Sequence, residues 1–231
     1  NGAAVVLKRV PDPQRFGVPI FDSNGKLVDV VEKPNNPPND FAVTGIYLYG
    51  PGVFFKAFDH IQKSKRREYE ISSIHSDFLK NNLKVGYKEI TGWWKDTGKP
   101  EDLISASKLL LQEIPEENFK IEGEVEAGAE IKNKVRVGAG TTINKNVKIT
   151  GPVLIGENCT LEDCVINPNT TIGAGSTIKN AEIKDSIILN RCDISCDIKL
   201  TGSIIGAGVT VVKNESGWQK MILGENTLIE I

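Results

Sequence analysis

A long repetitive stretch decides the fold, and within it residues 135–161 read VRVGAGTTINKNVKITGPVLIGENCTL. Across residues 119–211, aliphatic side chains return about every six positions. A period near 3.6 would indicate a helix, and strict alternation would indicate an ordinary strand. A period of six residues indicates instead the hexapeptide repeat of a parallel β-helix, whose left-handed form we expect here.

Each hexad is expected to form one short strand with an aliphatic residue pointing inward and a second inward residue near the corner. Glycines such as Gly138 and Gly140 supply tight backbone at the corners. The inward aliphatic residues are predicted to be Val125, Ile131, Val137, Ile143, Ile149, Ile155, Leu161, Ile166, Ile172, Ile178, Ile183, Ile188, Ile194, Leu200, Ile205 and Val211. The corner residues, four positions further on, are predicted to be Ala129, Val135, Thr141, Val147, Val153, Cys159, Val165, Thr170, Ser176, Ile187, Cys192, Ile198, Ile204 and Val209.

The composition is that of a soluble globular protein, with 231 residues, 39% hydrophobic and 25% charged. A net charge of −2 gives no reason to expect a nucleic-acid partner. The sequence contains no apolar run long enough to span a membrane and no signal-peptide pattern, so we predict a cytoplasmic location and no membrane partner. The chain begins at Asn1 rather than Met and resembles a piece of a longer protein.

The four cysteines, Cys159, Cys164, Cys192 and Cys196, all fall within the repeat. Cys159 and Cys192 occupy predicted inward corners, where a small apolar group fits. A zinc site is the alternative, but no CxxC pair is present and residues 116–231 contain no histidine. We therefore predict reduced, structural thiols.

The N-terminal half mixes strand and helix patterns, which indicates an α/β layer. Residues 41–49 are expected to form a central strand, and Pro115 to end the last helix and mark the boundary between domains 1–115 and 116–231. The layer is predicted to be incomplete, because no glycine-rich phosphate loop follows the first strand. The expected strands are 3–10, 16–22, 27–32, 41–49 and 83–90, and the expected helices are 52–63, 70–79 and 99–114.

Five short motifs in this half occur in a characteristic order and spacing, namely FGV at 16–18, EKP at 32–34, VTGIY at 43–47, RREYEI at 66–71 and WWKDTG at 93–98. In this order they resemble the sugar-1-phosphate nucleotidylyltransferases. The similarity is greatest to the long-form glucose-1-phosphate thymidylyltransferases, which carry a β-helix after the catalytic domain. Residues 222–226, ILGEN, also resemble the end of that long form.

The resemblance implies an enzyme that joins a nucleoside triphosphate to a sugar-1-phosphate, forming an NDP-sugar, dTDP-glucose in the first instance, and pyrophosphate. It implies Mg²⁺ as cofactor, because two polyanions must approach each other. By resemblance, the catalytic residues are Lys33, Asp96 and Arg66, with Lys33 and Arg66 on the sugar phosphate and Asp96 on the metal. The implied substrate-binding residues are Gly17, Glu32, Thr44, Gly45, Tyr47 and Trp94.

Each of these residues also has a structural interpretation. Glu32 and Lys33 could form a solvated strand end, Asp96 could be a turn residue, and Arg66 a surface charge. Arg67 stands where the family usually has glycine, and Ser73 where an acid is common. The family's glycine-rich nucleotide loop and second metal-binding aspartate lie N-terminal to residues present here. We therefore expect the chain by itself neither to bind nucleotide tightly nor to turn over.

Other functions remain open from the sequence. A UDP- or GDP-sugar pyrophosphorylase fits the same motifs. A hexapeptide acyltransferase would use the same β-helix, but acyl transfer commonly needs a histidine base, and the two histidines, His60 and His75, fall in the other half. A non-catalytic β-helix used for oligomerisation or regulation is the third alternative, and flat aliphatic faces favour a homo-oligomer in either case.

Overall fold

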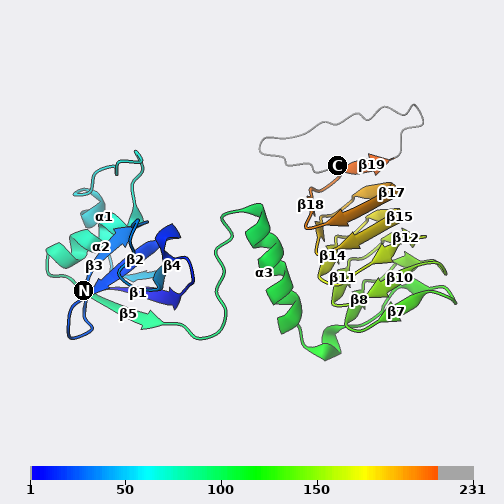
Figure 1. Ribbon diagram of the computed structural model, residues 1–231, viewed down its shortest axis with the longest axis horizontal. Coiled ribbons are helices and arrows are strands. Elements are labelled where there is room, and N and C mark those ends of the chain that lie inside the picture. The colour runs from blue at the N-terminus through cyan, green and yellow to red at the C-terminus, as the bar shows by residue number, and fades with distance from the viewer. Residues whose placement is uncertain (1, 213–231) are drawn as a thin grey trace. The chain divides into compact units, whose positions relative to one another are not determined.

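The computed structural model of the protein describes residues 2–212 and divides into two compact units, with the break between Asp96 and Thr97 (Figure 1). Contacts group helix α3 (Pro100–Glu113) with the second unit. The domain boundary at Pro115 remains a prediction. The family-like tail at residues 222–226 lies outside the described residues.

The first unit contains the strands predicted in this half and the first two predicted helices, the first of which is shorter than the expected 52–63. It consists of β1 (Gly2–Arg9), a 3₁₀ turn (Pro13–Arg15), β2 (Gly17–Phe21), β3 (Leu27–Glu32), β4 (Phe41–Tyr49), α1 (Val53–Phe58), α2 (Ile71–Lys80) and β5 (Lys84–Glu89). Strands β2 and β3 form the expected antiparallel hairpin. The other three strands are ordered β4-β1-β5, with β1 antiparallel to β4 and parallel to β5. The prediction that residues 41–49 form the central strand is wrong, because β1 takes a partner on each side.

Two small apolar clusters hold this unit together. One joins β1 to the hairpin and β4 through Val5, Leu7, Leu27, Val30 and Val43. The other packs α1 and α2 against β1 and consists of Ala3, Ala57, Ile74 and Phe78. Ala3, Val5 and Leu7 are every second residue of β1, so they point to the same face of the strand. That face is buried, with Ala3 in the second cluster and Val5 and Leu7 in the first. Strand β1 thereby fixes the positions of the hairpin, β4 and α2.

The second unit is the predicted parallel β-helix. After α3 and a 3₁₀ turn (Glu116–Asn118) its strands are β6 (Glu124–Val125), β7 (Glu130–Lys132), β8 (Val135–Val137), β9 (Thr142–Ile143), β10 (Lys148–Thr150), β11 (Val153–Ile155), β12 (Thr160–Glu162), β13 (Val165–Ile166), β14 (Thr170–Ile172), β15 (Thr177–Lys184), β16 (Ile187–Ile188), β17 (Asp193–Thr201), β18 (Ile204–Ile205) and β19 (Thr210–Val212). Every pairing recorded between these strands is parallel. The stacked rungs in Figure 1 are consistent with the left-handed β-helix predicted from the hexads.

The predicted aliphatic residues stack in register along the inside of the coil. Leu161 pairs with Ile143 on one neighbouring rung and with Ile178 on the other. The predicted residues from Val137 to Ile194 are all buried, whereas Ile131, Leu200, Ile205 and Val211 are only partly buried and Val125 is 39% exposed. Burial falls off at the ends because each end rung has a neighbour on one side only.

The corner prediction is wrong at two rungs. Cys164 and Ser186 are buried there, whereas Val165 and Ile187 are only partly buried. In both rungs the inward aliphatic residues are five rather than six positions apart, from Leu161 to Ile166 and from Ile183 to Ile188. The rung is therefore one residue shorter, and its corner comes three rather than four positions after the first aliphatic residue. Three of the four cysteines are therefore buried inside the coil, and all four are free thiols.

Across residues 2–212, the helices are too short or too polar to traverse a bilayer.

Candidate functional site

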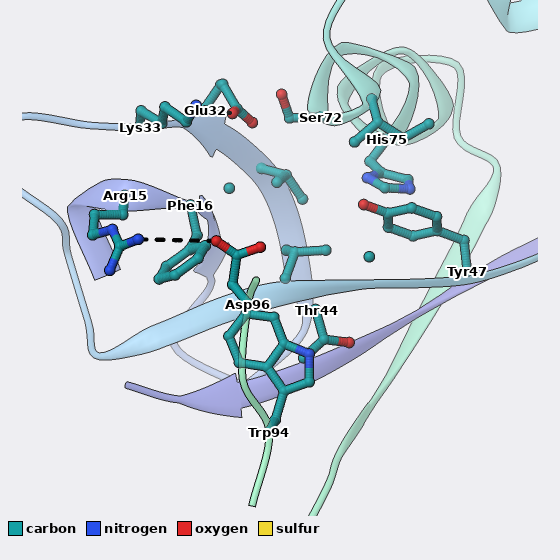
Figure 2. Close-up of a pocket in the computed structure, with 15 residues that line it drawn as sticks. Arg15, Phe16, Glu32, Lys33, Thr44, Tyr47, Ser72, His75, Trp94 and Asp96 are labelled. Atoms are coloured by element: carbon teal, nitrogen blue, oxygen red, sulfur yellow. Dashed lines mark ion pairs between the residues drawn. The ribbon is translucent and has the colours of Figure 1, made fainter. Parts of the chain in front are cut away.

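A cavity of about 260 Å³ in the first unit brings together residues that are distant in the sequence (Figure 2). Its wall comes from β2, the end of β3, the middle of β4, the first turns of α2 and the segment that follows β5. Its lining residues are Arg15, Phe16, Gly17, Val30, Glu32, Lys33, Val43, Thr44, Gly45, Tyr47, Ile71, Ser72, His75, Trp94 and Asp96. All the residues implied by the family resemblance line this cavity, except Arg66.

Lys33 lies at the point where the hairpin strand β3 ends. Its backbone adopts the left-handed conformation, with φ of 45°, and its N–H donates to the Phe16 carbonyl at 2.9 Å. Its Nζ lies 4.0 Å from Glu32 Oε1. A non-glycine residue in this region is uncommon and is held there by its surroundings. The hairpin therefore presents a cation and a carboxylate, Lys33 and Glu32, side by side at the cavity.

Gly17 faces Glu32 across the same hairpin. A Cβ at Gly17 would lie 3.4 Å from Glu32 Oε2, which is tighter than most such contacts. Glycine at this position leaves the space beside the carboxylate open.

Strand β4 contributes its residues through an irregularity in its pairing with β1. The register shifts between Val5, opposite Tyr47, and Leu7, opposite Val43. Gly45 lies in the shifted segment with φ of 79°, as expected of a β-bulge that redirects side chains. The Thr44 hydroxyl donates to the Val6 carbonyl at 3.0 Å and fastens the segment to β1.

Tyr47 follows the bulge and lines the cavity as a neutral phenol. Burial raises its pKa above the usual value, and the negative charge of Glu32 adds to this effect. Its hydroxyl therefore stays protonated at physiological pH. The Tyr47 ring also packs against His75, with ring centroids 5.0 Å apart.

Trp94 and Asp96 lie in the segment that follows β5. The Trp94 ring meets Phe16 edge-on, with centroids 5.4 Å apart. Asp96 Oδ2 lies 3.9 Å from Arg15 Nη2, as the dashed line in Figure 2 marks. Lys33 and Asp96, the two residues on which the family interpretation depends most, thus line the same cavity.

Arg66 contributes no side chain to the cavity wall. Its guanidinium hydrogen-bonds Glu68, and its Nε lies 3.4 Å from Glu70 Oε1. The hydrogen bond that Arg66 donates to Glu68 is the main cause that raises the pKa of Arg66. Arg67, which replaces the family's usual glycine, keeps the left-handed backbone typical of glycine, with φ of 64°.

The cavity residues that are absent from the sequence-based set include one cationic and one imidazole side chain, Arg15 and His75. Arg15 immediately precedes the FGV motif, and its Nη1 also lies 2.9 Å from Asp12 Oδ2. His75 is fully buried, and its Nε2 lies 2.9 Å from the Tyr49 hydroxyl. Burial lowers the pKa of His75 to about 4, so the imidazole is neutral at physiological pH. The RREYEI motif ends shortly before His75 and was the nearest signal in the sequence.

The acidic residues of the cavity bear on the predicted magnesium ion. Within residues 2–212, no group of three or more histidine, cysteine, aspartate or glutamate side chains is arranged to hold a metal. Asp96 can supply one carboxylate oxygen, and Mg²⁺ is commonly held by one or two carboxylates together with substrate phosphates. The residues present thus fit a partial metal site.

Comparisons with known proteins agree with this geometry. Residues 1–113 match the family model described as nucleotidyl transferase, and residues 149–230 match the GMPPB C-terminal domain. A glucose-1-phosphate thymidylyltransferase from Streptomyces antibioticus is 31% identical over 99% of this chain and 64% of its own length. The low-salt glycan biosynthesis nucleotidyltransferase Agl11 from Haloferax volcanii is 28% identical over 100% of this chain and 64% of its own. The bifunctional protein GlmU from Methanocaldococcus jannaschii is 31% identical over 84% of this chain and 51% of its own.

An α/β layer with this cavity, followed by a parallel β-helix, defines a nucleotidyltransferase architecture. The chain is similar over nearly its whole length to sugar-1-phosphate nucleotidylyltransferases, and its first 113 residues match the nucleotidyl transferase family model. It spans less than two thirds of the length of the first relatives that it matches.

Proposed function

We propose that this chain carries the sugar-phosphate-binding part of an enzyme that forms an NDP-sugar and pyrophosphate, with dTDP-glucose as the expected product. The observation that supports this proposal is the convergence of Lys33, Glu32 and Asp96 on one cavity of about 260 Å³. A cation, a hydrogen-bond acceptor and a potential metal ligand are what a sugar-1-phosphate requires. The thymidylyltransferase relative supports the choice of dTDP-glucose.

Each cavity residue has a role that its chemistry suits. Lys33 offers a compact positive charge to the phosphate. Glu32 accepts hydrogen bonds from sugar hydroxyls, and Gly17 and Gly45 let the sugar approach the backbone. Tyr47, Thr44 and Trp94 form the wall around the ring. Arg15 takes the place at the cavity that the resemblance gives to Arg66, which pairs instead with Glu68 and Glu70.

In the proposed reaction, an oxygen of the sugar phosphate attacks the α-phosphorus of the nucleoside triphosphate and pyrophosphate leaves. Lys33 and Arg15 reduce the repulsion between the two polyanions by neutralising the sugar phosphate. Mg²⁺, when bound, would neutralise the triphosphate, and Asp96 is the residue that would hold it. The expectation that the isolated chain does not turn over stays a prediction, and a pyrophosphate-release assay with dTTP and glucose 1-phosphate tests it.

The binding role can be tested without turnover. Calorimetric titration of the 231-residue chain with glucose 1-phosphate should show binding that glucose and inorganic phosphate do not reproduce separately. Lys33→Met should weaken binding by about 10- to 100-fold, since hydrogen bonds to charged groups contribute ~1.5–3 kcal/mol. Lys26→Met is the matched control, because Lys26 lies just before β3 at the opposite end of the same hairpin strand and is exposed. Equal affinity of the wild type and Lys33→Met would refute the proposal.

Separate measurements distinguish the alternatives. If the protein prefers UTP or GTP to dTTP, this result would indicate a UDP- or GDP-sugar pyrophosphorylase. Release of free thiol from acetyl-CoA in the presence of an amino sugar would indicate an acyltransferase. The homo-oligomer and the oligomerisation role of the β-helix are predictions that analytical ultracentrifugation tests. The cytoplasmic location also stays a prediction.

A further inference from the structure

His75 leaves a buried polar atom without a partner at the cavity wall. The residue has no exposed surface, and its Nδ1 makes no hydrogen bond among the residues that the structure describes. Its other ring nitrogen, Nε2, is paired with the Tyr49 hydroxyl at 2.9 Å. An unpaired buried donor or acceptor costs ~1–3 kcal/mol, so the position is expected to be filled when the site is in use.

The hydrogen bond with Tyr49 decides which ring nitrogen of the neutral His75 imidazole carries the hydrogen. Burial raises the pKa of Tyr49, so its hydroxyl keeps its proton. His75 Nε2 is the hydrogen-bond partner recorded for that hydroxyl in the described part of the chain. If Nε2 carried the hydrogen, the Tyr49 hydroxyl would accept from it, and the described residues show no other acceptor for the Tyr49 proton. We therefore assign the Tyr49 hydroxyl as the donor to Nε2, which leaves Nδ1 with an N–H that needs an oxygen acceptor.

The cavity positions this donor away from the phosphate-binding residues. Figure 2 shows Arg15 and Lys33 on one side of the cavity and His75 beside Tyr47 on the other. A sugar phosphate held by Lys33 would extend its far hydroxyls toward His75. Glu32, when ionised, only accepts hydrogen bonds. Any sugar hydroxyl can turn its hydrogen toward this carboxylate, so Glu32 discriminates between sugar hydroxyls less than a fixed donor does.

We propose that His75 Nδ1–H donates a hydrogen bond to a sugar hydroxyl remote from the phosphate and thereby selects the sugar. This inference rests on the proposed function of the cavity. His75 acts as a binding residue of fixed polarity, because its tautomer is set by Tyr49 behind it. A site that leaves a buried donor unpaired rejects ligands that lack the matching acceptor.

Two amide substitutions separate this role from a merely structural one. His75→Asn places an amide where Nδ1 lies, and so keeps a group for the ligand while losing the contact with Tyr49. His75→Gln extends an amide to where Nε2 lies, and so keeps the contact with Tyr49 while losing the group for the ligand. If His75 contacts the sugar, His75→Gln should bind glucose 1-phosphate about tenfold more weakly, and His75→Asn should stay within about threefold of wild type. If His75 only supports Tyr49, the two variants should show the reverse order.

A set of glucose 1-phosphate analogues, each lacking one hydroxyl, identifies the partner. The wild type should lose affinity for the analogue that lacks the contacted hydroxyl, and His75→Gln should no longer distinguish it from the parent, because the two changes remove the same interaction. The Nδ1–H resonance of His75 should shift on adding glucose 1-phosphate, and it is assignable because the chain has only two histidines.

The outcomes also separate this inference from the proposed function. If wild type binds glucose 1-phosphate but His75→Gln binds it equally well, the inference is overturned and the proposed function stands. If the wild type binds no sugar phosphate, the proposed function fails and the inference falls with it. An Nδ1–H resonance that does not move on ligand binding, with water as the only partner, would also overturn the inference.

Discussion

The Asp96 carboxylate lies 3.9 Å from the Arg15 guanidinium, although the two residues are separated by most of the first unit in sequence. Both side chains are partly exposed, at 34% for Arg15 and 43% for Asp96, so their attraction is screened by water. The Arg15 cation and Asp96, the proposed metal ligand, therefore attract each other only weakly at the cavity. Arg15 consequently competes with any metal ion for the Asp96 carboxylate.

The first prediction follows from this competition. Arg15→Gln should raise the affinity of the chain for Mn²⁺, used as a probe for Mg²⁺, by about 1.4- to fivefold, which corresponds to the ~0.2–1 kcal/mol of a partly exposed pair. Asp96→Asn should abolish the specific binding. Water-proton relaxation measures both effects. Arg9→Gln is the control, since Arg9 pairs with Asp40 and Glu89 rather than with a cavity residue.

The backbone of Lys33 allows its charge and its conformation to be tested separately. With φ of 45°, Lys33 occupies a region that costs L-residues roughly 1–2 kcal/mol but is open to glycine. Lys33→Gly should therefore keep the free energy of unfolding within about 1 kcal/mol of wild type while sugar-phosphate binding is lost. Urea unfolding and calorimetric titration measure the two properties. A variant that lost stability and binding together would contradict the proposed role of the side chain.

The β-helix offers a matched pair of corner glycines. A Cβ on Gly138 would lie 2.7 Å from the Glu157 backbone nitrogen on the next rung, whereas a Cβ on Gly206 would meet nothing nearer than Val209 Cγ2 at 3.7 Å among the described atoms. Gly138→Ala should lower the free energy of unfolding by about 1–3 kcal/mol, because the clash is with backbone and cannot be relieved by a rotamer change. Gly206→Ala should change it by less than about 0.5 kcal/mol.

Thermal unfolding followed by circular dichroism compares these variants. Equal destabilisation by the two substitutions would contradict the close approach of neighbouring rungs as the reason for glycine at position 138. A large effect at Gly138 only would show that the requirement is the close approach of neighbouring rungs.

An ion pair within the second unit predicts a dependence of stability on pH. Lys108 Nζ, on α3, lies 2.7 Å from Asp185 Oδ1, on the β-helix. The hydrogen bond from Lys108, followed by that from Asn169, holds the pKa of Asp185 below its usual value. A lowered folded-state pKa stabilises the protein above the ordinary value near 3.8, and this contribution is lost as pH falls through the lowered pKa.

Asp185→Asn should therefore lower the melting temperature slightly at pH 7 and converge with wild type as pH falls through the lowered pKa of Asp185. The stabilisation lost at pH 7 should be under about 1 kcal/mol, because the two side chains are about a third exposed. Asp193→Asn, on the same β-helix but without a recorded lysine or arginine partner among the described residues, is the control. Curves that stay apart at acid pH would contradict the assignment.

The sequence by itself determined the β-helix and its inward column. This was possible because each rung buries residues that are close in the sequence, so the period of the chain reports the period of the fold. The order of strands and helices in the first unit followed from local patterns in the same way. The motifs around Lys33 and Asp96 belong to segments that line one cavity.

Local pattern did not decide how these elements pair. Strand β1, rather than β4, became central because strand order depends on contacts between residues far apart in the chain. The inward corners at Cys164 and Ser186 depended on where a shortened rung loses its residue, which the spacing alone leaves open.

Only the tertiary structure decided which charged and polar side chains meet in the cavity. Arg66 belongs to a recognisable motif, yet it pairs with Glu68 and Glu70, which are its neighbours in the chain. Arg15 and His75 carry no motif of their own, and they line the cavity because β2 and α2 converge there. The unpaired Nδ1 of His75 arises from burial and from the position of Tyr49, and neither quantity is encoded in the spacing of residues along one segment.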